Sequence, residues 1–336
     1  MMAMKQAITA ALVLLATVPA EAACRYVKFG SLPIDTAARS PRIDGSVNGR
    51  PIKVLVDTGA SITSLTRGIA ERAELPLSHS FRGAFGIGGE SEEYHASVRE
   101  LVMGPARWNN VRMSVVWDGA ADVDAILGAN FLLQNDIELL LKDKVINFFR
   151  PEDCKNTFLG YWDPDAIVLP LVEKGPKDLR AEVMIEVNGQ PVRTLIDSGA
   201  HASLIDEKVA AKLGVRKPTD GSAVEGAAAG VGTRQVATWI GRFDSVAIGP
   251  EVIQHARLTV MDMWGAARQD LRYSGSGALD DAPQMVLGAD FLASHRVLFA
   301  MSQRKLYLSH LGGPVFAKPA AAEPAVPPAS APASAP

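Results

Sequence analysis

The stretch Val-Leu-Val-Asp-Thr-Gly-Ala, from Val54 to Ala60, recurs almost unchanged as Thr-Leu-Ile-Asp-Ser-Gly-Ala, from Thr194 to Ala200. In each stretch an apolar segment typical of a β-strand ends at an aspartate, Asp57 or Asp197, which a hydroxyl residue and a glycine follow. A single aspartate in this setting usually caps a turn or a helix. Two of them at matching places call for a search for a longer internal repeat.

The repeat extends well beyond these two stretches. The fourteen residues from Val47 to Ala60 align without gaps with those from Val187 to Ala200, and eight of the fourteen are identical. Further on, Ile126 to Leu132 recurs as Val286 to Leu292, at a larger offset, so the second copy carries an insertion. We assign that insertion to a polar loop at Gly265 to Leu279. The chain is therefore predicted to contain two homologous lobes.

Most of the predicted secondary structure is β-strand. Asn48-Gly49 and Asn188-Gly189 are strong hairpin signals, and each lies between two strand-like segments. Short helices are few; Asp206 is placed to cap one at 207–213. The predicted domains are a signal peptide at 1–22, a first lobe at 31–150, a linker at 151–167, a second lobe at 168–310 and a disordered Pro/Ala-rich tail at 311–336.

Charge and the N-terminal residues restrict the classes of function. A net charge of −3 over 336 residues offers no basic surplus to neutralise phosphates, so no nucleic-acid partner is predicted. Lys5, the apolar run Ala7 to Val18 and Ala20-Glu21-Ala22 match a cleavable secretory signal. A membrane anchor is the alternative, but the run is shorter than the roughly 20 residues that span a bilayer. We expect an exported protein, periplasmic or secreted, with no stable membrane span after cleavage.

The chain has two cysteines, Cys24 and Cys154. In an exported protein they could form one disulfide, which would tie the mature N-terminus to the segment between the lobes, or remain two thiols. The sequence leaves both possibilities open. Neither the cysteines nor the six histidines have the spacing of metal ligands, so no metal and no cofactor is predicted.

If the two lobes pack about an approximate two-fold axis, Asp57 and Asp197 face each other near that axis. Two carboxylates in close contact resist ionising together and share one proton, as the aspartic-protease dyad does. The ionised carboxylate can then act as general base on a water, and the protonated one can donate to the carbonyl oxygen of an amide. The pair titrates as a unit, so neither aspartate is assigned a fixed role.

Four neighbouring residues are predicted to support the pair. A glycine lets the backbone turn tightly and approach a carboxylate without a Cβ, and a hydroxyl residue can bond across the axis to the opposite loop. These supporting residues are Thr58, Gly59, Ser198 and Gly199.

The motifs resemble those of the retropepsin-like (pepsin-superfamily) aspartic proteases, of the bacterial exported type with two homologous lobes in one chain. That family has two apolar residues before Asp-Thr/Ser-Gly-Ala, and later two apolar residues before Gly. Here these are Leu55 to Ala60 with Ile126 to Gly128, and Leu195 to Ala200 with Val286 to Gly288. The resemblance implies an all-β fold of two closed-barrel (acid protease) lobes related by a pseudo-two-fold axis. It also implies an aspartic-type endopeptidase with a polypeptide substrate in a cleft between the lobes.

The resemblance further implies a Gly-rich β-hairpin flap over the cleft. Each lobe has a candidate, which is more like the two flaps of retroviral-type dimers than the single flap of pepsin; the alternative is an ordinary flexible loop. The flap candidates are Gly86, Ile87, Gly88 and Gly89 in the first lobe and Gly230, Val231 and Gly232 in the second.

Three alternatives accompany this interpretation. The same scaffold could be a non-catalytic peptide-binding module, although the catalytic signature is intact in both lobes. His201 follows the second signature where the first has Ser61; we expect a rim residue that tunes the site, and a catalytic role is the alternative. We expect a monomer to be active, because covalent duplication favours pairing of lobes within one chain; pairing between chains is the alternative.

Overall fold

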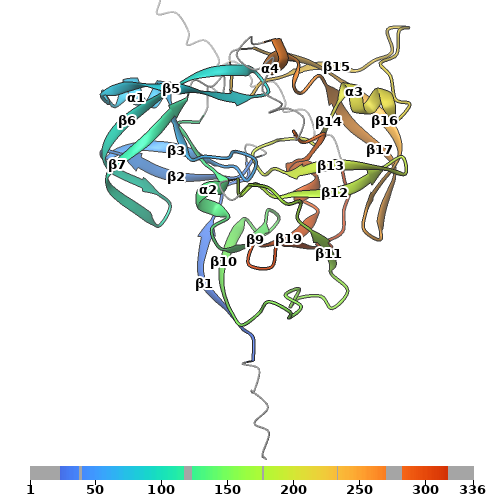
Figure 1. Cartoon of the computed structure of the whole chain (residues 1–336), viewed down its shortest axis with the longest axis horizontal. Helices are drawn as coiled ribbons and strands as arrows, with labels where there is room; N and C mark the ends of the chain where they lie inside the picture. Colours follow the sequence, from blue (N-terminus) through green and yellow to red (C-terminus); the bar gives the residue numbers. More distant parts are fainter. Residues whose placement is uncertain are drawn as a thin grey trace, which may run out of the picture.

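The computed structural model describes residues 23–37, 40–116, 123–175, 178–232, 234–269 and 282–316. Strands dominate: one barrel is built from the blue-to-teal part of the chain, a second from the yellow-to-orange part, and a shared sheet lies below both (Figure 1). The helices of the described residues are short: α1 Arg67–Arg72, α2 Ala129–Leu132, α3 Glu207–Lys212, α4 Gly265–Gln269 and α5 Ala289–Leu292.

The first lobe is a closed barrel. Its strands are hydrogen-bonded in the order β2-β3-β8-β4-β7-β6-β5, and β2 also pairs with β6, which closes six of them into a ring. Their bounds are β2 Arg42–Val47, β3 Arg50–Val56, β4 Ser64–Thr66, β5 Leu77–Gly86, β6 Gly89–Met103, β7 Ala106–Val116 and β8 Ala125–Leu127.

The second lobe repeats this topology strand for strand. The order is β12-β13-β18-β14-β17-β16-β15, and β12 pairs with β16 to close the ring. The predicted all-β fold of two closed-barrel lobes is confirmed. The bounds are β12 Glu182–Val187, β13 Gln190–Ile196, β14 Leu204–Asp206, β15 Glu225–Ala228, β16 Val236–Ile248, β17 Glu251–Met261 and β18 Met285–Leu287.

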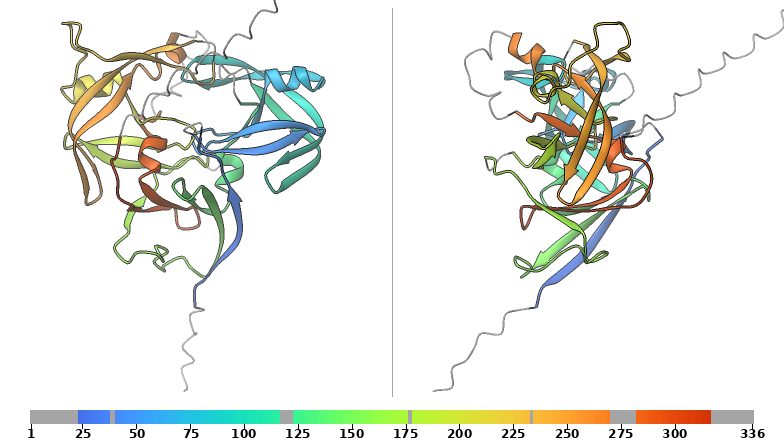
Figure 2. Two further views of the ribbon diagram at one scale, coloured as in Figure 1. Left: turned by 180° about the vertical axis from the view of Figure 1, so that it is seen from behind. Right: turned by 90° about the vertical axis from the view of Figure 1, so that its right-hand side faces the viewer.

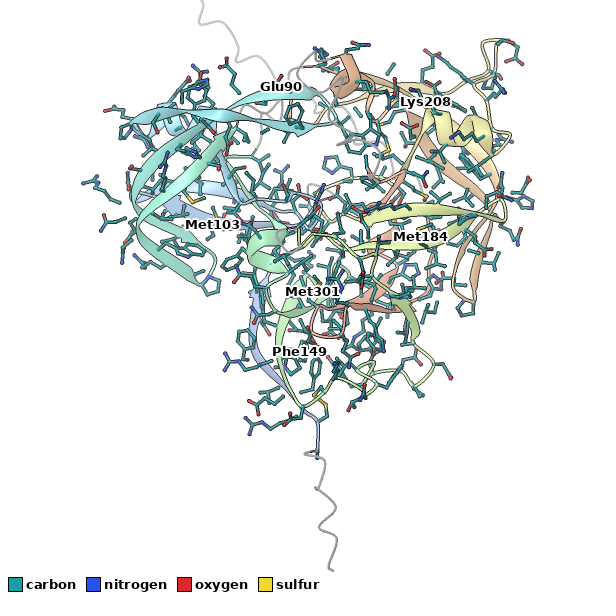
Figure 3. The ribbon with its side chains drawn as sticks, in the orientation of Figure 1. Glu90, Met103, Phe149, Met184, Lys208 and Met301 are labelled. Atoms are coloured by element: carbon teal, nitrogen blue, oxygen red, sulfur yellow. A yellow bond between two sulfur atoms is a disulfide. The ribbon has the colours of Figure 1, made fainter. Side chains whose placement is uncertain are left out.

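A third sheet, which is not predicted from the sequence, joins the lobes. Its order, β1-β10-β9-β19-β20-β11, is symmetric about the central pair β9–β19. Figure 2 shows this sheet below both lobes from behind and from the side. Phe149 and Met301 mark its region in Figure 3. The bounds are β1 Arg25–Pro33, β9 Asp136–Leu140, β10 Val145–Glu152, β11 Ile167–Pro170, β19 His295–Ala300 and β20 Lys305–His310.

The local signals in the sequence form the expected elements. Asn48 and Gly49 have φ of 51° and 79°, and Asn188 and Gly189 have φ of 49° and 70°. Positive φ at both central residues is what the tightest hairpin turns require, so both hairpins are confirmed. The Asp206 side chain accepts a hydrogen bond from the backbone N–H of Lys208 and caps α3.

The region predicted as a linker, 151–167, is packed against the shared sheet. Cys154 forms a disulfide with Cys24, next to β1. Leu159 is buried, and the Trp162 indole donates to Ser309 Oγ at 3.0 Å. Strand β10 also continues to Glu152, beyond the expected end of the first lobe. The apolar and aromatic side chains of this segment have the lower sheet to pack on, which the sequence did not reveal.

Two other segments differ from expectation. The tail was predicted to have nothing to bury, yet its residue Phe316 is buried and stacks on Phe291 of α5. The predicted inserted loop begins with helix α4. Residues 1–22, 270–281 and 317–336, which hold the predicted signal peptide and the rest of the insertion and tail, lie outside the described residues. In the described part of the chain, no helix is both long and apolar enough to cross a membrane.

The disulfide closes a long loop, which gives it a large expected effect on stability. The two cysteines are 130 residues apart in sequence. We expect the double variant Cys24→Ser/Cys154→Ser to lose about 2–5 kcal/mol of unfolding free energy, because the unfolded chain gains freedom. Urea unfolding measures the loss. A reductant should lower wild-type stability to that of the variant and leave the variant unchanged; a reductant effect on the variant would contradict this assignment.

Candidate active site

The two signature loops follow equivalent strands of the two barrels. Strand β3 ends at Val56, and the Asp57 N–H donates to the Leu127 carbonyl at 3.0 Å. Likewise β13 ends at Ile196, and the Asp197 N–H donates to the Leu287 carbonyl at 3.0 Å. The Leu-Gly segments predicted to run beside these loops do so, because β8 and β18 pair in parallel with β3 and β13.

Glycine is required where these segments pass the loops. A Cβ on Gly128 would lie 2.7 Å from the Ile62 carbonyl carbon, and one on Gly288 would lie 2.7 Å from that of Ala202. Any larger residue would push the loop away. The glycine of the second family motif therefore sets how closely a strand can approach its signature loop.

Thr58 and Ser198 join the two loops by four reciprocal hydrogen bonds. The Thr58 N–H donates to Ser198 Oγ at 3.1 Å, and the Ser198 N–H donates to Thr58 Oγ1 at 3.0 Å. Each hydroxyl then donates to the other lobe, Thr58 to the Ile196 carbonyl and Ser198 to the Val56 carbonyl, both at 2.8 Å. Both side chains are almost fully buried, so these bonds do not compete with water. These four bonds therefore fix the position of one signature loop relative to the other.

This frame brings Asp57 and Asp197 into contact. In each, Oδ1 accepts two backbone N–H groups of its own loop, from Gly59 and Ala60 at 2.8 Å for Asp57. A Cβ on Gly59 would collide with the Asp197 carboxyl, and one on Gly199 would collide with that of Asp57. Each carboxyl thus lies over the glycine of the opposite loop, which places the two carboxyls next to each other.

The electrostatics favour one shared proton. Burial raises the pKa of Asp57 well above its ordinary value, and the charge of Asp197 raises it further. Burial also raises the pKa of Asp197, although the hydrogen bond from Asp57, two backbone N–H groups and the charge of Arg180 oppose that rise. Both residues keep some accessible surface, as a group that meets a substrate must. The pair can therefore keep one proton at a pH at which two separate aspartates would both be ionised.

Ser40 is a site residue that sequence reasoning missed. It is fully buried, its hydroxyl donates to the Gly199 carbonyl at 3.0 Å, and it lies 2.5 Å from His201 Nδ1. A serine hydroxyl has one hydrogen, so Nδ1 of His201 donates when that hydrogen is given to Gly199. His201 itself is exposed at the edge of the loop. A difference between the two copies of the repeat could have drawn attention to Ser40, because the equivalent position in the second lobe is Arg180.

Arg180 differs from Ser40 in what it binds. Its guanidinium forms a two-pronged pair with Asp178, from Nε at 2.9 Å and Nη2 at 2.7 Å. Its charge also lowers the pKa of Asp197. The two sides of the aspartate pair are therefore chemically different, although the loops are symmetric.

The two flap candidates meet each other. The first is the turn between β5 and β6, and the second follows β15 (Figure 1). The Gly88 N–H donates to the Val231 carbonyl at 2.9 Å, and the Arg234 N–H donates to the Gly88 carbonyl at 3.2 Å. Gly88 and Gly232 form a parallel bridge, and a Cβ at Gly232 would collide with the Gly88 backbone. The tips can approach this closely because Gly88 and Gly232, the two residues that meet, have no side chains.

The flap tips also pack on the second lobe. Ile87 of the first flap packs against an apolar cluster that includes Leu204 and Met263. The Arg234 guanidinium donates to the Ala266 carbonyl of α4 at 2.9 Å. The inserted segment thus supports the contact between the flaps. Among the residues that the structure describes, no group of His, Cys, Asp and Glu side chains is arranged to hold a metal ion.

Comparisons with known proteins match an aspartyl protease family model to each lobe. A family model described as gag-polyprotein putative aspartyl protease matches residues 43–134, and one described as aspartyl protease matches residues 183–291. The chain is also similar to the crystal structure of aspartic proteinase from Irpex lacteus, at 14% identity and a TM-score of 0.48, over 84% of this chain and 97% of that one. No curated protein matches the sequence. The two family models fall one on each lobe and together span more than half of the chain.

The bonds between Thr58 and Ser198 predict a stability effect. We expect Ser198→Ala to lower the free energy of unfolding by about 1–3 kcal/mol, because it leaves the buried Thr58 N–H without its hydroxyl partner. Adding Thr58→Ala should cost less than the sum of the two single changes, since the residues share partners. Urea unfolding measures all three variants. The control Thr58→Ser keeps the hydroxyl and should stay near wild type; a loss as large as that of Ser198→Ala would argue against the assigned bonds.

The shared proton predicts how stability depends on pH. A raised pKa in the folded state means that folded protein holds a proton that unfolded protein has released, so the free energy of unfolding falls as pH rises from about 4 through the raised pKa. One proton contributes at most about 1.4 kcal/mol per pH unit. We expect Asp57→Asn to reduce this decline, as measured by urea unfolding at several pH values.

A matched control separates this effect from general acid sensitivity. Asp44→Asn removes an exposed carboxylate that pairs with Lys53 and should leave the pH slope at the wild-type value. Parallel pH curves for wild type and Asp57→Asn would exclude a proton held by the pair.

Proposed function

The two lobes of this chain belong to the retropepsin-like (pepsin-superfamily) aspartic proteases, and from this premise we propose that the chain is an endopeptidase using Asp57 and Asp197 as one catalytic pair. The observation that carries the proposal is the contact between the two carboxyls inside a symmetric, hydrogen-bonded frame. A peptide-binding module would not need two carboxyls held in so costly an arrangement.

The geometry supports water attack on a peptide carbonyl. The ionised carboxyl takes a proton from a water between the pair as that water attacks the carbonyl carbon, and the protonated carboxyl donates to the carbonyl oxygen. The tetrahedral diol then collapses: one of its hydroxyls gives a proton to the ionised carboxyl, the C–N bond breaks, and the leaving nitrogen receives a proton from the protonated carboxyl. Two protons have entered the pair and two have left, so the pair returns to its starting state.

We propose that the substrate lies between the catalytic loops and the joined flap tips. With the tips bonded at Gly88 and Val231, a polypeptide cannot enter from above until they separate. Two backbone hydrogen bonds and the packing of Ile87 hold the tips together, so they can separate and rejoin at modest cost. Closure over a bound peptide would exclude water from the developing charges.

We propose a monomeric, exported enzyme. A single chain supplies both aspartates, and the shared sheet joins the two lobes without a second copy. The disulfide between Cys24 and Cys154 suits an oxidising compartment, periplasmic or extracellular. Cleavage before Ala23 would leave the N-terminus next to this disulfide.

Removing either carboxylate tests the catalytic assignment. We expect Asp57→Asn and Asp197→Asn each to lower kcat/KM by about 100- to 10,000-fold, because the pair can no longer provide both acid and base. The measurement is cleavage of peptide libraries and unfolded protein at several pH values, read by mass spectrometry. Asp44→Asn is the matched control and should cleave like wild type.

Mixing the two inactive variants tests where the active pair forms. If both aspartates of an active site come from one chain, a mixture of Asp57→Asn and Asp197→Asn stays inactive. Recovery of activity on mixing would show pairing between chains. Equal cleavage by wild type and Asp57→Asn would reject the proposed mechanism, and saturable peptide binding without cleavage by wild type would indicate a binding module.

A further inference from the structure

Each barrel has a face that points away from its core, toward the flaps and the signature loop. In the second lobe, Ile205 and Leu287 belong to the main core, while their neighbours Leu204 and Val286 point to the other side of the sheet. Ala200 of the signature loop and Ile87 of the first flap pack on that other side. We call it the second-lobe wall, formed by Leu195, Leu204, Met261, Met263 and Val286.

The strand register identifies the equivalent positions in the first lobe. Leu204 pairs with Val286 and Thr259, and Ser64 pairs in the same way with Ile126 and Ser114. On the flap strands, Thr238 lies opposite Met261, and Glu93 lies opposite Val116. The first-lobe wall therefore consists of Leu55, Ser64, Glu93, Ser114, Val116 and Ile126.

Glu93 faces this wall and not the barrel core. Its neighbour Tyr94 and the next inward residue, Ala96, pack in the main core, and successive strand residues point to opposite sides. Two hydroxyl groups hold the carboxylate: Ser114 Oγ donates to Oε1 at 2.7 Å, and Ser80 Oγ donates to Oε2 at 3.1 Å. The residue is 8% exposed. Glu93 thus places a carboxylate at the position where the second lobe has Thr238, beside the apolar second-lobe wall.

This carboxylate lacks the partner that the other buried glutamates have. Glu182 pairs with Lys174 and Arg193, and Glu138 pairs with Arg296. No Lys or Arg of the described residues forms an ion pair with Glu93, and its donors are neutral hydroxyls. A buried carboxylate without a counter-charge is costly, so a cation supplied from outside the chain would be bound favourably there.

We propose that Glu93 is a specificity-determining residue that binds a lysine or arginine side chain of the substrate, while the second-lobe wall binds an apolar side chain. The proposal rests on the proposed function, namely that a peptide lies across Asp57 and Asp197. Because the two walls are related by the two-fold axis of the lobes, they receive side chains equally far from the scissile bond, on opposite sides of it.

The chemistry of the first-lobe wall suits a long basic side chain. The methylene groups of lysine or arginine can lie along Val116 and Ile126, and the charged end can reach the Glu93 carboxylate. Hydrogen bonds between two charged groups are stronger than those between neutral ones. An apolar side chain would leave Glu93 buried and unpaired, and an acidic one would repel it. The second-lobe wall offers methionine and branched apolar side chains and no charge.

The test compares matched peptides on the purified full chain. A peptide cleaved by wild type is varied at each position around the cut with lysine, arginine, norleucine or glutamate; norleucine matches the lysine stem without its charge. At one position we expect lysine or arginine to exceed norleucine by about 10- to 100-fold in kcat/KM. At the position equally far on the other side of the cut, norleucine should exceed lysine.

Two variants test whether Glu93 causes the preference for a basic side chain. Glu93→Gln keeps the shape and removes the charge, so the ratio of lysine to norleucine should fall close to one. Glu92→Gln makes the same change one residue away, at an exposed side chain bonded to Tyr94, and should keep the wild-type ratio. A wild type without a basic preference, or a preference that survives in Glu93→Gln, would overturn the proposal. The comparison of peptides on the wild-type protein remains valid even if a variant fails to fold.

A measurement of peptide binding distinguishes a failure of this inference from a failure of the proposed catalysis. Fluorescence anisotropy with Asp57→Asn measures binding of labelled lysine and norleucine peptides without cleavage. Tighter binding of the lysine peptide, with no cleavage by wild type, would reject the catalytic proposal and support the role of Glu93. Cleavage without a basic preference would reject the role of Glu93 alone. If the wild type cleaves no peptide and Asp57→Asn binds none, both proposals are rejected.

Discussion

The close approach of two partly buried carboxyls costs free energy, and the reciprocal hydrogen bonds of Thr58 and Ser198 make it possible. Each hydroxyl accepts an N–H from the opposite loop and donates to a carbonyl of the opposite lobe, so the two loops cannot shift independently. The aspartates beside them are held at a separation at which they repel unless they share a proton. The two barrels present these loops to each other, and the shared sheet joins the barrels.

The frame is symmetric, but its surroundings are not. Ser40 and His201 contact each other on one side of the pair, while the equivalents on the other side are Arg180 and Ser61. The inserted helix α4 supports the flap contact on the second lobe alone. Duplication provides two equal carboxylates, which the shared-proton chemistry needs. The later differences between the copies give the two sides of the site different chemistry, and Glu93 is the clearest example.

Features encoded by neighbouring residues were predictable from the sequence. The Asn-Gly hairpins, the cap at Asp206 and the strands before each aspartate follow from backbone preferences over a few residues. The shared sheet was not predictable, because β9 and β19 pair across more than 150 residues and nothing local marks a strand as a joint between lobes. For the same reason the sequence predicts a linker at 151–167, although Leu159 and Trp162 pack against that sheet.

The ungapped repeat is visible in the sequence, so two copies of one lobe and the equivalent positions of Asp57 and Asp197 are predictable without coordinates. Three features emerge only in the folded chain: the carboxyls lie next to each other, the flap tips bond through Gly88, and Glu93 faces away from the core with no Lys or Arg partner among the described residues. Contact, burial and charge pairing depend on residues that are distant in the chain, so no local pattern predicts them. A motif specifies which groups are present, and packing decides what surrounds them.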